Sequence, residues 1–185
     1  MDNNGAYERN LMDLRVIEPT AQQLTIIEQQ LGRPPRGLVG IAHQTADGIP
    51  VVLQMRSLVD DQPFPTLYWL CSRDLHRALA QIEDQGWVKW IEAEILRDEA
   101  LWGAYQADQR AYVAARWQAM DPNDKARIEA LGFSELFDRY GIGGISNWEK
   151  VRCLHMQYAQ HLVMGSEIGR RLDAEFGLAD LSIRL

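Results

Sequence analysis

The sequence predicts a helix-dominated α+β fold, with helices packed on a small, mainly antiparallel sheet of about three strands. Three observations lead to this prediction. Two runs rich in β-branched residues flank a turn that contains Asp47-Gly48, which is typical of a β-hairpin. A third run alternates its side chains over residues 66–71. From Ser72 onward, apolar residues recur at three- and four-residue spacing, as they do along helices.

The first helix and the strands have recognisable boundaries. Thr20 is expected to cap a helix that ends at Gly32, where Pro34-Pro35 prevents continuation. The two strands of the hairpin are expected over residues 37–44 and 49–55. An acidic linker then leads to the third strand.

The second half of the chain reads as consecutive helices. Ser72 caps the first of them, Gly86 interrupts it, and the apolar period continues to about Met120. Asp121-Pro122 is a cap followed by a first-turn proline, so it opens another helix. Further helices are expected from Ser134, before Gly165, and over 166–176.

Length and composition predict one domain. A chain of 185 residues with 46% hydrophobic and 24% charged residues is typical of a single globular unit. We expect residues 1–19 to be a flexible lead-in and residues 20–185 to form the domain. The formal net charge of −7, without a basic block, disfavours binding to nucleic acid.

Two cysteines are too few for a disulfide scaffold and fit a reducing cytoplasm. No apolar run reaches the length of a membrane span, and the first residues lack the pattern of a signal peptide. We therefore expect a soluble, cytoplasmic protein that does not bind membranes.

A glycine-rich stretch, residues 141–155, leads into the helix that ends before Gly165. Ser146 and Glu149 have the spacing of a capping box, so the helix is expected to begin there. His155 then lies within an apolar stripe, which favours a buried, structural histidine. On such a helix Cys153 would point about 160° away from His155. This geometry argues against a metal chelate, and we expect no metal ion and no cofactor.

Several segments together resemble one family. They are 30–37, 48–52, 63–70 and, near the end, Gly143-Gly144 with 151–155. Their order is similar to that of a bacterial family known as domain of unknown function 501, over about residues 25–170. The resemblance implies no established activity. Many members carry a cysteine in the hairpin turn near the place of Thr45, so a metal site shared by the family is not expected in this chain.

Anion binding is the leading functional hypothesis. A glycine-rich turn before a helix presents free N–H groups and partial positive charge, and arginine suits phosphate or carboxylate. We expect a pocket between the Pro-Pro loop, the third strand and the start of that helix. Its predicted residues are Arg33, Arg36, Tyr68, Gly143, Gly144, Arg152 and His155. The structural alternative for the glycines is a helix C-cap and a turn.

These features favour a non-catalytic binding or adaptor module over an enzyme. The alternative is a small enzyme that acts on a phosphate- or carboxylate-bearing metabolite, with His155 or Cys153 as acid/base or nucleophile. Tryptophans of the long helical region cannot all share one helix face, which indicates a protein partner or a homo-oligomer. These tryptophans are Trp87, Trp90, Trp102 and Trp117.

Overall fold

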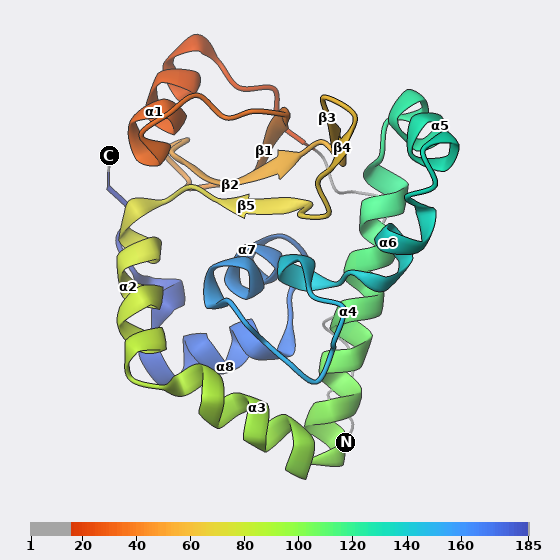
Figure 1. Cartoon of the computed structure of the whole chain (residues 1–185). Coiled ribbons are helices and arrows are strands. Elements are labelled where there is room, and N and C mark those ends of the chain that lie inside the picture. Colours follow the sequence, from red (N-terminus) through yellow and green to blue (C-terminus); the bar gives the residue numbers. More distant parts are fainter. Residues whose placement is uncertain (1–15, 185) are drawn as a thin grey trace, which may run out of the picture.

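A computed structural model describes residues 16–184 (Figure 1). Its main sheet has the strand order β1-β2-β5 and is antiparallel throughout. The strands are β1 (Leu38–Gln44), β2 (Pro50–Met55) and β5 (Tyr68–Leu70). The predicted three-stranded antiparallel sheet is therefore confirmed, and so is the helix-dominated α+β class.

The two faces of this sheet are covered by different helices. Because side chains alternate along a strand, Leu53 of β2 faces α1 (Ala21–Leu31), whereas its neighbour Val52 faces the opposite side. That opposite side packs against α7 (Leu154–Met164). Figure 1 shows α1 above the sheet and α7 below it. The core on the α7 side is much the larger of the two.

Most helix boundaries agree with the predicted caps. The side chains of Thr20, Ser72 and Asp121 each accept a backbone hydrogen bond in the first turn of their helices. The prediction missed a break at Asp98, which caps a new helix by accepting from the N–H groups of Ala100 and Leu101. The remaining helices are α2 (Arg73–Asp84), α3 (Trp87–Arg97), α4 (Glu99–Ala119), α5 (Pro122–Ala130), α6 (Ser134–Arg139) and α8 (Glu167–Phe176).

The expected acidic linker is instead a second, two-stranded sheet. Its strands are β3 (Leu58–Val59) and β4 (Gln62–Pro63). Between them, Asp60 and Asp61 have positive φ angles of 52° and 58°. Two such residues form the tight turn that a two-residue hairpin needs, and aspartate tolerates this conformation better than most residues. The sequence hid this hairpin because aspartates in a short loop also suit a plain linker.

The last residues of the expected lead-in are held on the sheet. Ile17 exchanges two backbone hydrogen bonds with Ile41 of β1, at 2.9 and 2.8 Å. Gly40 permits this approach, since a Cβ at that position would lie 2.4 Å from a side-chain carbon of Val16. Residues 1–15 of the lead-in lie outside the described residues.

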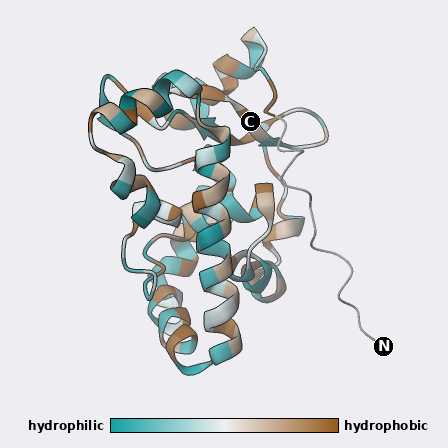
Figure 2. Ribbon diagram, turned by 90° about the vertical axis from the view of Figure 1, so that its right-hand side faces the viewer, coloured by the Kyte–Doolittle hydropathy of each residue, from teal (hydrophilic) through white to brown (hydrophobic). Residues whose placement is uncertain are grey.

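The helices carry mixed surfaces. Figure 2 shows hydrophilic and hydrophobic residues interleaved along them, as expected for helices that pack with one side on a core. Within residues 16–184, no helix combines the length and the apolar character that a membrane crossing requires.

Candidate functional site

The helix α7 begins at Leu154, and its N-cap Cys153 lies seven residues after the predicted N-cap Ser146. The prediction failed because acidic side chains from two other helices accept hydrogen bonds from the backbone N–H groups that precede and begin α7. Glu92 accepts the N–H of Val151 at 2.9 Å, and Glu83 accepts the N–H of Leu154 at 2.6 Å. Arg152 between them has a φ of 65°, which no helix could accommodate. The N–H groups at which we expected an external anion therefore donate to carboxylates of the protein itself.

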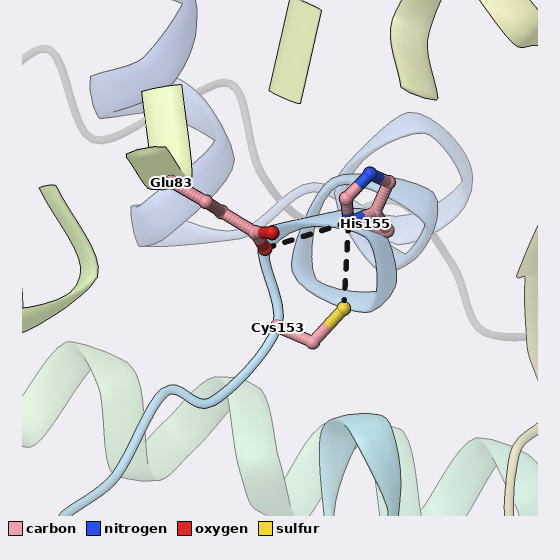
Figure 3. Close-up of side chains that lie close together, drawn as sticks. All are labelled: Glu83, Cys153 and His155. Carbon is pink, nitrogen blue, oxygen red and sulfur yellow. Dashed lines mark hydrogen bonds and ion pairs between the residues drawn. The ribbon is translucent and has the colours of Figure 1, made fainter. Parts of the chain in front are cut away.

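This late start brings Cys153 and His155 together. Cys153 has extended backbone angles, φ −133° and ψ 117°, and precedes the helix instead of lying within it. Its Sγ atom is 3.5 Å from Nδ1 of His155 (Figure 3). The predicted separation of about 160° is wrong because it assumed a helical cysteine. The argument against a metal chelate rested on that separation and loses its support.

Glu83, near the end of α2, completes a cluster of three. Its Oε1 atom is 3.4 Å from Nδ1 of His155, and Figure 3 shows its carboxylate and the thiol of Cys153 approaching the same imidazole. One donor atom from each residue lies within 4.8 Å of the others. We refer to Glu83, Cys153 and His155 as the three-donor cluster.

A second histidine orients the imidazole. The carbonyl oxygen of His76 lies 3.1 Å from Nε2 of His155, and the two rings lie 4.4 Å apart. A carbonyl only accepts, so Nε2 must carry a proton. In the neutral ring, Nδ1 is then unprotonated and directs its lone pair towards Cys153 and Glu83. The ring nitrogen Nε2 of His76 is fixed in turn, 3.1 Å from the carbonyl oxygen of Leu70.

Within the cluster, Cys153 and His155 each favour the charged form of the other. Burial lowers the pKa of His155, but the thiol of Cys153, the carboxylate of Glu83 and the His76 carbonyl outweigh burial and raise it. Burial and the carboxylate of Glu83 raise the pKa of Cys153, but the hydrogen bond between its sulfur and His155, the amide of Met156 and the charge of His155 outweigh them, so the pKa is lowered. The site is reachable from solvent, since the side chains of His155 and Glu83 are 13% and 28% exposed.

The donor set also suits a metal ion. Thiolate, imidazole and carboxylate are the three ligand types of protein-bound zinc. Tetrahedral bonds of ordinary length place sulfur and nitrogen roughly 3.5 Å apart, and nitrogen and oxygen roughly 3.4 Å apart. The observed distances are 3.5 and 3.4 Å. In the part of the chain that the structure describes, this is the one group of three or more such residues with this proximity.

The predicted anion-binding residues are divided by the sheet. Arg33 and Arg36 line a cavity on the α1 side, together with Leu53 and Trp69. Tyr68 points to the α7 side, where it is 1% exposed and part of the core. The alternation along β5 therefore separates Tyr68 from the two arginines, and the single pocket we expected is not formed.

The remaining predicted residues lie on the α7 side. Gly143 and Gly144 belong to a short 3-10 helix, Ile142–Gly144, where both have positive φ angles of 71° and 67°. They serve as turn residues, as the structural alternative anticipated. Arg152 is exposed and directly precedes Cys153. Of the predicted set, His155 belongs to the three-donor cluster and Arg152 directly precedes its Cys153 in the chain.

Sequence reasoning missed Glu83 and His76. They are seven residues apart on α2, so they share one side of that helix. Nothing in the sequence links α2 to a segment about seventy residues later. The available signal was two polar residues directly beside the buried positions Leu75 and Ile82.

Of the four tryptophans that suggested a partner, Trp90 is the most exposed, at 45%. Trp87 is buried and donates its indole N–H to Glu175 at 2.9 Å. Trp102 and Trp117 are half-buried. Core packing therefore accounts for most of these side chains, and a protein partner or homo-oligomer stays a prediction.

Comparisons with known proteins agree with the resemblance. No match was found among curated proteins or solved structures. The protein family DUF501, described as a protein of unknown function, matches residues 41–172. This match includes most of the sheet, the α2 residues Glu83 and His76, and the start of α7 with Cys153 and His155. The chain therefore belongs to the DUF501 family.

Proposed function

We propose that the three-donor cluster binds a divalent metal ion of the zinc class and leaves a coordination position open. The observation that carries this proposal is the agreement of two independent edges, 3.5 Å from sulfur to nitrogen and 3.4 Å from nitrogen to oxygen, with a tetrahedral site. Catalytic zinc sites use three protein ligands and keep the fourth position for water or substrate.

The surroundings of the cluster support the same proposal. Ligand histidines ordinarily donate their second ring N–H to a carbonyl or carboxylate, and His155 does so to His76. The carboxylate of Glu83 is held by the amide of Leu154. The donors are therefore oriented without a metal ion, which reduces the ordering that binding requires.

The open position and its neighbour indicate a reaction class. A zinc ion lowers the pKa of a bound water to near neutrality and polarises a carbonyl or phosphoryl oxygen. Within residues 16–184, exposed Arg152 has neither a hydrogen-bond nor an ion-pair partner. Its charge beside the cluster suits a substrate that carries a carboxylate or phosphate. We therefore propose metal-assisted hydrolysis of a small anionic substrate.

Metal binding is tested on purified protein, stripped with a chelator and then titrated with Zn²⁺ or Co²⁺. We expect about one ion per chain. Bound Co²⁺ should show the thiolate-to-cobalt charge-transfer absorption of a cysteine ligand. Cys153→Ser and Glu83→Gln should each weaken binding by about 10-fold or more.

Glu92→Gln is the matched control, because Glu92 also accepts an amide of this segment but lies outside the cluster. It should bind the metal as the unchanged protein does. Equal loss in Glu83→Gln and Glu92→Gln would mean that the carboxylates only shape the segment. Absence of stoichiometric metal in the unchanged protein would refute the proposal.

A metal-free thiol centre is the second candidate, because Cys153 and His155 are in direct contact. In this case Cys153 is the nucleophile, His155 the base, and the His76 carbonyl fixes the ring, as in other cysteine-dependent enzymes. The two candidates respond oppositely to a chelator. Activity of a thiol centre survives chelation, whereas that of a metal centre is lost and returns with Zn²⁺.

A further inference from the structure

A separate cavity lies on the α1 side of the sheet. It has a volume of about 310 Å³, within the lower range of small-molecule sites. Its apolar floor is made by Leu53 and Met55 of β2 and by Trp69 of β5. Phe64 stacks on Trp69, with ring centroids 5.9 Å apart and planes inclined by 27°. One wall is therefore aromatic, which suits a flat apolar group.

The second wall is the hairpin of β3 and β4, which is held in an unusual conformation. Positive φ angles at non-glycine residues cost free energy and persist where the surroundings fix them. Asp60 is fixed by an ion pair with Arg36, and Asp61 by one with Arg127 at 2.6 Å. Gly37 lets the Pro-Pro loop close on this hairpin, since a Cβ there would lie 2.6 Å from Val59.

The two arginines at the cavity differ in whether they have an ion-pair partner. Arg36 is occupied by Asp60, whereas Arg33 makes no hydrogen bond or ion pair with any other residue of the described range 16–184. In a chain of net charge −7, an uncommitted arginine beside an aromatic cavity favours an anionic ligand. Arginine matches a carboxylate with two parallel hydrogen bonds.

We infer that this cavity binds a small aromatic carboxylate, with the ring on the apolar floor that includes Trp69 and the carboxylate on Arg33. The volume of the cavity suits a small ligand, and among its lining residues Arg33 is the one cation without a partner in the described range 16–184, which matches a single negative charge. This site lies on the opposite face of the sheet from the three-donor cluster, and it does not rest on the proposed metal.

The probes are 3-phenylpropionate and its neutral amide, used with the full chain. Binding is followed by tryptophan fluorescence and by chemical-shift changes of the indole N–H groups. We expect the acid to bind about 5-fold or more tightly than the amide, because only the acid pairs with Arg33. Arg33→Gln should remove this difference by weakening the acid alone, and Arg33→Lys should keep part of it.

Arg110→Gln is the control for loss of one exposed positive charge on α4, and it should bind both probes as the unchanged protein does. Equal affinity for acid and amide would overturn the inference, and so would the absence of saturable binding. It would also be overturned if size-exclusion chromatography with light scattering showed a dimer in which a second copy shields the Trp69 indole.

Discussion

The two faces of the sheet place the same residue type in opposite chemical settings. On the α1 side, Cys71 is 1% exposed and its thiol donates to the carbonyl of Pro50 at 3.4 Å. On the α7 side, Cys153 is half-buried beside an imidazole. Burial raises the pKa of Cys71 to about 12, whereas the neighbours of Cys153 lower its pKa. Surroundings, not residue type, therefore set the reactivity of each thiol.

The two faces also differ in how completely they are filled. The α7 face carries the large core, and the three-donor cluster lies at its edge, where packed helices hold each side chain. The α1 face carries a small core beside the cavity of about 310 Å³. The first face is thus suited to hold reactive groups in place, and the second to enclose a ligand by shape.

The largest expected effect is in thiol alkylation of the metal-free protein. Iodoacetamide at neutral pH should label Cys153 on the order of 1,000-fold faster than Cys71, because the thiolate form of Cys71 is rare at its raised pKa. Peptide mass spectrometry after timed quenching measures both rates. Comparable rates at neutral pH would contradict the contrast between the faces.

The second effect concerns the cores. Leu70 and Leu53 are both 0% exposed and lie on paired strands but face opposite sides. Leu70→Ala should lower the free energy of unfolding by about 4 kcal/mol, and Leu53→Ala by only about 2–3 kcal/mol. The reason is that Leu53 already borders a cavity and has fewer packing contacts to lose. Urea unfolding followed by circular dichroism measures both, and the reverse order would show that the α1 face is the better packed.

The smallest effect is the cost of removing each sulfur. Cys71→Ala leaves a void in the α1-side core and should cost about 1–2 kcal/mol of unfolding free energy. Cys153→Ala in the metal-free protein should stay within about 0.5 kcal/mol, because its side chain precedes a helix and is half-buried. Thermal unfolding of the two variants, in the presence of chelator, gives the comparison. A costlier Cys153→Ala would assign that thiol a structural role.

Local sequence determined much of the fold. The caps at Thr20, Ser72 and Asp121, the Asp47-Gly48 turn and the alternation before Ser72 place most helices and the three-stranded sheet. These signals work because a cap or a tight turn is satisfied by residues within about four positions of itself.

Tertiary structure decided the candidate site. Ser146 and Glu149 have the sequence spacing of a local cap, yet the amides of Val151 and Leu154 donate to Glu92 and Glu83 of other helices instead. Those long-range hydrogen bonds delay the helix and turn Cys153 towards His155. A local pattern cannot reveal such competition, because the competing carboxylates come from residues about sixty to seventy positions away.

The same distinction explains the divided pocket. The sequence correctly predicted that the side chains of Tyr68 and Trp69 point to opposite faces of the sheet. It could not show which face α1 would cover and which face α7 would cover. The chain connections limit which face of the sheet each helix can reach. Burial of the apolar stripe of the helix then holds it on that face. Arg33 and Arg36 therefore lie on the face that α1 covers, and the donors of the three-donor cluster lie together on the other face.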